Sequence, residues 1–275
     1  MATSTKKTID VGFVGGGNMA EAMVKGLVAS GREASSMMVS EPDATRRRAM
    51  ARRYRVATTT DNAEVVRASR TVVLAVKPQV LGAVLESLRP LVTGRELFVS
   101  IAAGVMLDRL EKGLGPAARV VRVMPNTPCL VGRGTSVICA GSRAKPADVR
   151  AVRAMFASVG DAHVIEDEKL MHLVTALSGS GPAYVYRFAE ALIEAATGGG
   201  MDPSLARSLA YQTIAGAAAM MIETGQEPAD LRRAVSSPGG TTLAGLGYLD
   251  EKGFVDAIRG AVAAAAKRSV ELGKA

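Results

Sequence analysis

Short β-branched runs alternate with helix-like stretches over residues 9–165, and this alternation constrains the fold more than any other feature of the sequence. The runs predict strands at residues 11–14, 37–40, 72–76, 97–101, 120–124, 136–140 and 163–165. Helices are expected between them, at residues 19–29, 44–54, 63–68, 80–88 and 147–158. Near-continuous apolar strands that alternate with helices are typical of a parallel sheet covered on both faces. This half is therefore predicted to be a doubly wound α/β sheet.

The strand pattern stops after residue 167. Helices rich in Ala, Leu and Met are expected at residues 169–177, 183–196, 205–223 and 254–272. We predict two domains, with residues 1–165 forming the α/β domain and residues 166–275 forming an all-α domain. The helical half carries more apolar surface than so short a domain covers by itself. It is therefore expected to complete its core across a dimer interface.

Composition narrows the class of protein. Apolar residues make up 48% of the 275-residue chain, but no run approaches the roughly 18 to 20 apolar residues that span a bilayer. Residues 1–8 are followed by a Gly-rich segment and not by the apolar core of a signal peptide. Cys129 and Cys139 match no metal or redox spacing. We expect a soluble cytoplasmic protein that binds neither a membrane nor a metal ion.

Six arginines lie close together in a chain whose net charge is +8. They are Arg46, Arg47, Arg48, Arg52, Arg53 and Arg55. Such a cluster is compatible with nucleic-acid binding. However, the chain has no Trp, 4% aromatic residues and no nucleic-acid-binding motif around the cluster, so no nucleic-acid partner is expected. Two interpretations remain, which are a solvated helix face and a binding site for a phosphate group.

The first predicted strand ends in a dinucleotide-binding pattern, Gly15-x-Gly17-x-x-Ala20. Gly15 permits a tight turn, Gly17 lets the backbone approach a pyrophosphate, and Ala20 permits close packing of helix on strand. The start of the helix near Met19 would present free N–H groups to the anion. Because the pattern opens a long α/β alternation, it predicts a Rossmann-type nucleotide site and not an ordinary Gly-rich turn.

The end of the second predicted strand bears on the choice of coenzyme. Glu41 stands where an acid holds the ribose 2′-hydroxyl of NAD. Ser40, with Arg46 or Arg47, could instead hold the 2′-phosphate of NADP. These two signals conflict. The arginine cluster favours NADPH as the expected cofactor, and NADH remains possible.

Two proline-containing segments follow later strands, at the sheet edge where ligands bind in open parallel sheets. One segment contains Val76, Lys77 and Pro78, and the other contains Asn126. Both segments are also compatible with rigid turns that bind no ligand. The predicted cofactor-binding residues are Gly15, Gly17, Asn18, Met19, Ser40, Arg46, Arg47, Val76, Lys77, Pro78 and Asn126.

Two segments rich in Ser and Gly, residues 178–184 and 236–242, each lead into a helix-like stretch. Bare N–H groups beside hydroxyls suit a small carboxylate, although each segment alone is more often a helix cap. The order of the motifs closely resembles the pyrroline-5-carboxylate reductase family over about residues 9–272. The motifs are Gly15-Gly-Gly-Asn-Met-Ala, Ala75-Val-Lys-Pro, Ser100-Ile-Ala-Ala-Gly-Val, Met124-Pro-Asn-Thr-Pro, Leu177-Ser-Gly-Ser-Gly-Pro-Ala-Tyr and Ser237-Pro-Gly-Gly-Thr-Thr.

The resemblance implies NAD(P)H-dependent reduction of 1-pyrroline-5-carboxylate to L-proline, the last step of proline biosynthesis. It also implies a Rossmann domain joined to a helical domain that interlocks in a homodimer, with decamers of five dimers among family members. By the same resemblance, Thr242 would reach the ring nitrogen of this imino acid as the catalytic residue, and the loop could come from the neighbouring subunit. The implied substrate-binding residues are Val235, Ser236, Ser237, Gly240, Thr241 and Thr242.

A cyclic imine demands little acid–base chemistry of the protein, because a protonated imine accepts hydride from the cofactor. His163 and His172 lie in no motif suited to acid–base work and are expected to be structural. An alcohol dehydrogenase would need a strong acid–base group for the alkoxide. A threonine hydroxyl is too weak an acid to supply a full proton, so Thr242 is expected to orient the nitrogen and help relay a proton from water.

Two other functions fit parts of the pattern. A β-hydroxyacid-dehydrogenase-like oxidoreductase also joins a Rossmann domain to a helical one, but it uses a Lys on a Gly-rich helix. Val185, Tyr186 and Arg187 follow the Gly-rich segment here, without a Lys. A non-catalytic NADP-binding regulatory protein would have no use for the loop at residues 237–242. That loop therefore favours the imine reductase.

Overall fold

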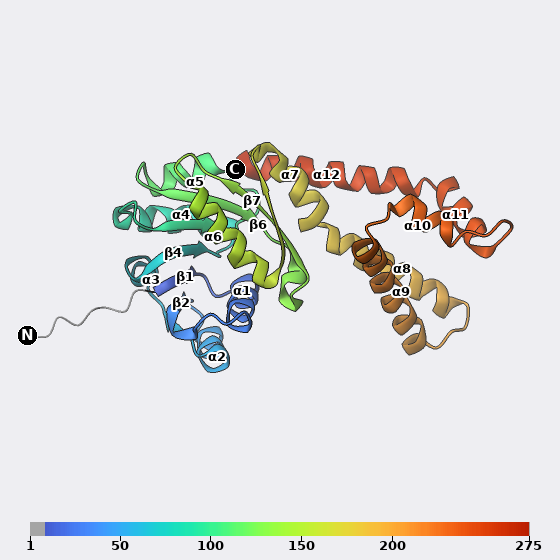
Figure 1. Ribbon diagram of the computed structural model, residues 1–275, viewed down its shortest axis with the longest axis horizontal. Helices are drawn as coiled ribbons and strands as arrows, with labels where there is room; N and C mark the ends of the chain where they lie inside the picture. Colours follow the sequence, from blue (N-terminus) through green and yellow to red (C-terminus); the bar gives the residue numbers. More distant parts are fainter. Residues whose placement is uncertain (1–8, 275) are drawn as a thin grey trace, which may run out of the picture. The chain divides into compact units, whose positions relative to one another are not determined.

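The computed structural model of the protein describes residues 9–274, so the expectation that residues 1–8 lead into no signal peptide concerns a segment outside the described part. One eight-stranded sheet has the order β3-β2-β1-β4-β5-β6-β7-β8 (Figure 1). Its strands are β1 (Ile9–Val14), β2 (Met37–Ser40), β3 (Ala57–Thr59), β4 (Ser69–Leu74), β5 (Leu97–Ser100), β6 (Arg119–Met124), β7 (Gly134–Ala140) and β8 (Gly160–Ile165).

The strands pair in parallel, with one exception among those described, since β7 runs antiparallel to β6. The predicted parallel sheet is therefore confirmed as mostly parallel, with one antiparallel pair. The cause is the short connection between Met124 and Gly134, which leaves no room for the crossover of about a dozen residues that parallel pairing needs. The other neighbouring strands are joined through helices or longer connections, as a doubly wound fold requires.

Helices cover both faces of the sheet, which confirms the predicted α/β class (Figure 1). Consecutive residues of one strand point to opposite faces, so Phe13 packs in one core cluster and Val14 in the other. The first cluster receives α1 (Asn18–Ala29), α2 (Ala44–Tyr54) and α6 (Pro146–Phe156). The second receives α3 (Asn62–Ala68), α4 (Pro78–Leu88) and α5 (Leu107–Leu114).

The second half is helical, as predicted, and its first helix is irregular. A 3₁₀ turn at Glu168–Leu170 leads into α7 (Met171–Val174) and then into a π-helical turn at Thr175–Gly179. The remaining helices are α8 (Gly181–Gly198), α9 (Pro203–Thr224), α10 (Pro228–Ala234), α11 (Thr241–Glu251) and α12 (Phe254–Lys274). Further 3₁₀ turns lie at Ala34–Ser36, Arg89–Leu91, Thr127–Val131 and Ala157–Val159.

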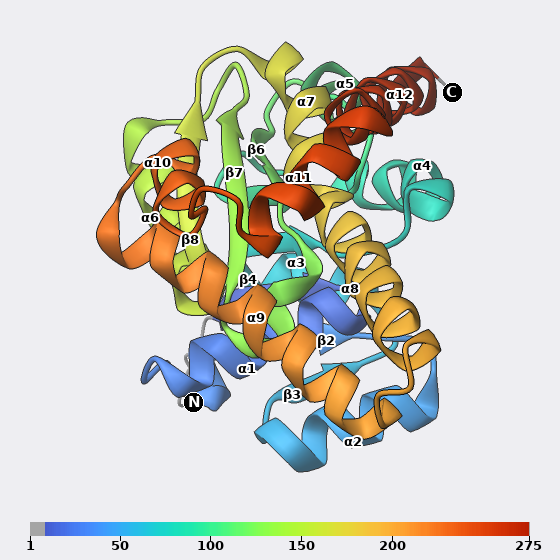
Figure 2. The ribbon, with the colours of Figure 1, turned by 90° about the vertical axis from the view of Figure 1, so that its right-hand side faces the viewer.

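The chain divides into two compact units. One unit runs to Ser180 and includes the residues from Ala265 onward, and the other is Gly181–Ala264. Within the second unit α8 and α9 pack side by side (Figure 2). Every residue of this unit is described, and three small residues are buried, namely Ala189, Ala206 and Ala210. None of its large apolar side chains is fully buried within the chain, so this unit has almost no core of its own.

An ion pair inside the first unit fixes the start of the irregular helix. Arg122 on β6 is almost fully buried, and its Nη1 lies 2.8 Å from Oε1 of Glu168. The same oxygen accepts a hydrogen bond from the backbone N–H of Leu107 at 2.7 Å. Close by, Nδ1 of His172 lies 3.0 Å from the hydroxyl oxygen of Ser269 on α12. These contacts attach both ends of the helical region to the α/β unit.

Candidate functional site

The loop between β1 and α1 has the backbone geometry of an anion site. Gly15 has a φ of +99°, and a Cβ atom at this position would lie 2.8 Å from the carbonyl oxygen of Ala75. Both the dihedral and the close approach therefore require glycine here. Gly17 caps the 12-residue helix α1, and a Cβ there would meet nothing within 4 Å. Open space thus lies above the free N–H groups at the helix start, where Asn18 is exposed.

Glu41 closes one side of this loop. Its Oε2 accepts a hydrogen bond from the backbone N–H of Gly16, and its Oε1 accepts one from that of Asp43, each at 2.9 Å. The residue is only 8% exposed. A Cβ atom on Gly16 would lie 3.0 Å from the Cβ of Glu41, so this contact explains the middle glycine of the Gly15–Gly16–Gly17 run.

The three residues considered for a 2′-phosphate differ in accessibility, since Ser40 is buried, Arg47 is partly buried and Arg46 is exposed. Ser40 is buried, and its hydroxyl donates to Oδ1 of Asn62 at 2.5 Å, so this donor is engaged within the protein. Arg47 donates from Nη1 to the backbone carbonyls of Glu41 at 2.7 Å and Pro42 at 3.2 Å. Arg46 is exposed in the first turn of α2. Its backbone N–H is bound by the Asp43 cap at 2.7 Å.

The segment after β4 lies beside the Gly-rich loop. The backbone N–H of Ala75 donates to the carbonyl of Val14 at 2.8 Å, and a Cβ on Gly15 would come within 3.0 Å of the Val76 side chain. Lys77 is the N-cap of α4 and is exposed, with Pro78 at the first helical position. Val76, Lys77 and Pro78 therefore stand at the same sheet edge as Gly15, where they were expected.

Asn126 is engaged by the protein at both ends of its side-chain amide. Its Oδ1 accepts the backbone N–H of Thr135 at 2.9 Å, and its Nδ2 donates to the carbonyl of Ser178 at 3.1 Å. A Cβ on Gly179 would lie 2.5 Å from Cε of Met124. The two motifs around Asn126 and Ser178 therefore meet. Asn126 thus stands at the sheet edge where a coenzyme-binding residue was expected, with its amide engaged by the protein, and no local sequence pattern predicts this contact with Ser178.

The predicted substrate loop is a tight turn between α10 and α11. The backbone N–H of Gly240 donates to the carbonyl of Ser237 at 3.0 Å, and Gly239 has a φ of +70°. A positive φ after Pro238 is typical of a type II turn, which selects glycine at that position. Gly240 then caps α11, whose first turn presents the N–H groups of Thr241 and Thr242.

Hydroxyl groups flank this turn. Thr242 is half-buried, and among residues 9–274 no hydrogen bond to its hydroxyl is formed. Ser236 donates from its hydroxyl to the carbonyl of Arg232 at 2.7 Å, which leaves its oxygen lone pairs as acceptors. Val235 is 68% exposed. The loop therefore combines a helix N-terminus with at least one uncommitted hydroxyl, which suits a carboxylate together with a second polar group.

Two family models match parts of this chain. Residues 168–272 match the family model described as pyrroline-5-carboxylate reductase dimerisation, and residues 10–104 match the model described as NADP oxidoreductase, coenzyme F420-dependent. A pyrroline-5-carboxylate reductase of Synechocystis sp. is 44% identical over 97% of this chain and 99% of that relative. One from Pisum sativum is 43% identical over 95% of each. The chain belongs to the pyrroline-5-carboxylate reductase family.

Solved structures of the pyrroline-5-carboxylate reductase family have the same fold. The enzyme of Coxiella burnetii matches with a TM-score of 0.91 at 36% identity, covering 98% of this chain and 100% of that one. The enzyme of Plasmodium falciparum, solved with NADP bound, matches with a TM-score of 0.86 at 34% identity, covering 97% and 99%. The architecture of this chain, a mostly parallel sheet followed by helices, is thus that of pyrroline-5-carboxylate reductases.

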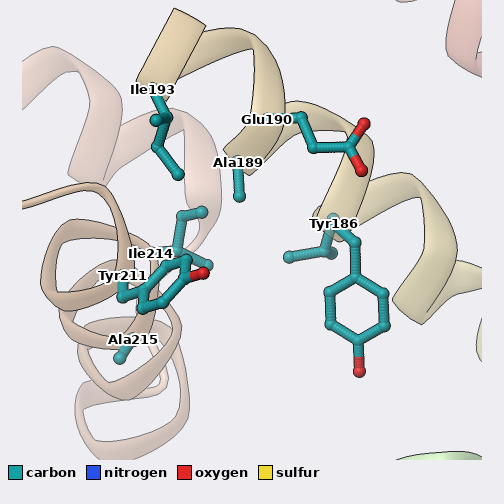
Figure 3. A pocket seen from close by; sticks show the side chains of 8 residues that line it. Tyr186, Ala189, Glu190, Ile193, Tyr211, Ile214 and Ala215 are labelled. Atoms are coloured by element: carbon teal, nitrogen blue, oxygen red, sulfur yellow. The ribbon is translucent and has the colours of Figure 1, made fainter. Parts of the chain in front are cut away.

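A pocket between α8 and α9 falls in the part of the chain matched by the dimerisation model. Its volume is about 480 Å³, and Tyr211 and Ile214 of α9 face Ala189 and Ile193 of α8 across it (Figure 3). Glu190 at its edge pairs with Arg187 at 2.9 Å. The lining offers no free cation for a carboxylate substrate. This apolar hollow therefore lies in the region that the dimerisation model matches, and its lining does not suit a carboxylate.

Burial shifts the pKa of several side chains outside the loops described above. Burial lowers the pKa of His172, which contacts Ser269, and His163 is exposed on β8. Burial raises the pKa of the thiols of Cys129 and Cys139. Within residues 9–274, His, Cys, Asp and Glu form no cluster of three or more that could hold a metal ion. None of the described helices is long and apolar enough to cross a membrane.

Proposed function

We propose that this chain reduces 1-pyrroline-5-carboxylate to L-proline, with NADPH as the preferred coenzyme and NADH as a possible one. The observation that carries the proposal is the turn at residues 237–242, where a helix start and the free hydroxyl of Thr242 lie together. Membership of the reductase family over almost the whole chain supports it. The NADP bound to the Plasmodium falciparum relative and the NADP oxidoreductase model support the choice of NADPH.

The coenzyme would be held at the carboxyl edge of the sheet. We assign the pyrophosphate to the N–H groups of Gly17, Asn18 and Met19 at the start of α1, above the turn at Gly15. Val76, Lys77 and Pro78 would border the same coenzyme. When bound, the coenzyme supplies the hydride. The chain itself needs only to bind and orient the substrate and the coenzyme and to exclude water.

The substrate carboxylate would lie on the N–H groups of Gly240, Thr241 and Thr242, with the hydroxyls of Ser236 and Ser237 and the side chain of Val235 beside it. An anion at a helix start is stabilised by the helix dipole. The Thr242 hydroxyl would then bind the ring nitrogen. It is too weak an acid to give up a proton outright, so it would orient the nitrogen and pass on a proton from water.

The family match also supports a proposal about the oligomeric state of the chain. The chain carries the dimerisation region of the reductases, and we propose that it forms a homodimer, which assembles further into decamers of five dimers. Large side chains on Gly181–Ala264 support the homodimer, because Ile222 is 78% exposed and Tyr248 is 63% exposed within the single chain. Side chains of this kind are costly to leave in water. We further propose that the enzyme acts in the cytoplasm, with residues 1–165 as the nucleotide domain and 166–275 as the substrate and dimer domain.

One assay tests the proposal. The purified protein is mixed with NADPH and 1-pyrroline-5-carboxylate, and the loss of NADPH absorbance is followed while proline is quantified by mass spectrometry. We expect NADPH loss and proline formation in equal amounts. Oxidation of β-hydroxyacids without imine reduction would favour the dehydrogenase alternative. NADPH binding without turnover of either substrate would favour a regulatory protein.

A further inference from the structure

Backbone hydrogen bonds hold the carboxylate of Glu41 in place directly after β2. Both carboxylate oxygens accept a backbone hydrogen bond at 2.9 Å, one from Gly16 and one from Asp43. Among the described residues, no cation forms an ion pair with this carboxylate. Arg47, the nearest candidate in sequence, directs its guanidinium to backbone carbonyls instead. A fixed negative charge, not neutralised by a side chain, therefore lies beside the Gly-rich loop.

The position of this charge matters for the coenzyme. Glu41 directly follows β2, and in dinucleotide-binding folds the residue at this place faces the ribose of the adenosine half. A carboxylate has about four acceptor sites, and the two backbone N–H groups occupy two of them. The remaining sites can accept a ribose 2′-hydroxyl, which NADH carries. A 2′-phosphate at the same place would face like charge.

The carboxylate is not free to turn away from a phosphate. Gly16 packs so closely on Glu41 that a Cβ atom would lie 3.0 Å from the Glu41 Cβ and 3.2 Å from its Oε2. Rotation of the side chain would also leave the N–H groups of Gly16 and Asp43 without their acceptors. An unmade hydrogen bond of a buried group is costly. The repulsion is therefore built into the loop.

Two exposed arginines on α2 carry a charge of opposite sign to that of Glu41. Arg46 and Arg48 are exposed, and within residues 9–274 neither guanidinium forms an ion pair. They can attract a 2′-phosphate, whereas a ribose hydroxyl gains little from them. We propose that Glu41 is a specificity-determining residue, whose carboxylate accepts the ribose 2′-hydroxyl of NADH and limits the preference for NADPH that these arginines create. This inference rests on the proposed reductase function and adds to it the origin of coenzyme choice.

The test compares two variants that each remove one negative charge from the same turn. Glu41→Gln removes the charge at the ribose position with little change in shape. Asp43→Asn is the matched control, because Asp43 is exposed and caps α2 through the N–H of Arg46, which an asparagine also does. The quantity measured is kcat/KM for NADPH divided by kcat/KM for NADH, with 1-pyrroline-5-carboxylate as substrate. We expect Glu41→Gln to raise this ratio about tenfold or more and Asp43→Asn to change it less than about threefold.

A binding measurement separates this inference from the proposed reaction. Calorimetry compares adenosine 2′,5′-bisphosphate with adenosine 5′-monophosphate on wild type and on Glu41→Gln. If wild type fails to reduce the imine but Glu41→Gln strengthens binding of the bisphosphate relative to the monophosphate, the proposed function fails and the role of Glu41 stands. If both ratios stay within twofold of wild type, Glu41 is only a clamp on the loop and the inference is overturned. Should Glu41→Gln not fold, Glu41→Ser carries the same test.

Discussion

The side-chain amide of Asn126 joins two motifs that lie 52 residues apart, because its Nδ2 donates to the carbonyl of Ser178 at 3.1 Å. Ser178 lies in the π-helical turn Thr175–Gly179, in which the N–H of Ser180 reaches back to the carbonyl of Thr175 at 2.8 Å. Such turns are uncommon and are often found at functional sites. The contact therefore fixes an irregular backbone segment against the sheet edge that we assign to the coenzyme.

Asn126→Asp should weaken this attachment. The change keeps the acceptor for the N–H of Thr135 but replaces the donor to Ser178 by a second oxygen, which repels the carbonyl. We expect a loss of about 1–3 kcal/mol in the free energy of unfolding and a fall in kcat/KM of about tenfold. Denaturant unfolding and steady-state kinetics measure the two effects. Thr135→Ala is the control, because Thr135 contributes its backbone N–H. An unaltered Asn126→Asp enzyme would mean that the π-helical turn holds without this contact.

Local patterns predicted the elements well where the hydrophobic period was clear. The expected strand at residues 37–40 and the expected helix at residues 44–54 coincide with β2 and α2. Short elements contain too few residues to show a hydrophobic period. The edge strand Ala57–Thr59 has three residues, and α5 (Leu107–Leu114) has eight, so neither was expected. The segment at residues 236–242 was expected to lead into a helix, and α11 confirms this, while no bounds were predicted for the seven-residue helix α10.

The site could be predicted only as far as its backbone. Glycines, prolines and small residues mark where a chain turns, so the loops at Gly15, Lys77 and Gly240 were expected in their observed contexts. Side-chain partners depend on the tertiary structure. The burial of Ser40 against Asn62 and the two backbone contacts of Glu41 join residues that local patterns treat as independent.

Thr242→Ala should lower kcat/KM for the imine by about 10- to 1,000-fold, equivalent to roughly 1.4 to 4 kcal/mol of transition-state stabilisation. The reason is that the Thr242 hydroxyl makes no hydrogen bond among the described residues, so it is free to bind the ring nitrogen. Thr242→Ser retains the hydroxyl and should keep most of the activity. Steady-state kinetics with 1-pyrroline-5-carboxylate decides the matter, and a Thr242→Ala enzyme within twofold of wild type would remove Thr242 from the site.

Arg46→Ala and Arg47→Ala should have different effects on the two coenzymes. Arg46 is exposed, so its loss should weaken NADPH much more than NADH, which lacks the 2′-phosphate. Arg47 binds the carbonyls of Glu41 and Pro42 and thereby supports the turn itself, so its loss should weaken both coenzymes. Fluorescence titration with NADPH and NADH measures these affinities. If Arg46→Ala weakens the affinity for NADPH and NADH equally, Arg46 attracts anions in general. If neither affinity changes, Arg46 is a solvated residue without a role in coenzyme binding.

His172 should make the protein less stable in mild acid. Burial lowers the pKa of His172, and the positive charge of Arg122 lowers it further by a smaller amount. The negative charge of Glu168 acts in the opposite direction. Because the folded pKa lies below the unfolded value of about 6.5, the unfolded chain takes up the proton first as pH falls. The stabilising contribution is therefore present above about pH 6.5 and is lost as pH falls toward the folded pKa. Denaturant unfolding between pH 8 and 5 should show this decline, and His172→Gln should flatten it. A parallel profile in that variant would assign the decline to other groups.

The isolated chain should not be the active species. Gly181–Ala264 buries only Ala189, Ala206 and Ala210 in the single chain, and it lies within the residues matched by the reductase dimerisation model. We therefore expect light scattering at micromolar concentration to report at least a dimer of the 28.5 kDa chain. Ile222→Glu places a charge at a side chain that is 78% exposed in this region and should shift the protein toward monomer, because an unpaired charge is costly to bury in an interface.

Val131→Glu is the matched control for this prediction, since Val131 is 73% exposed and lies outside residues 168–272. It should leave the measured mass unchanged. If Ile222→Glu also leaves the mass unchanged, Ile222 lies outside the interface, and a different part of the helical surface holds the subunits together. An active wild-type monomer of 28.5 kDa at micromolar concentration would contradict the proposed homodimer itself, because the exposed apolar side chains of Gly181–Ala264 would then need no partner.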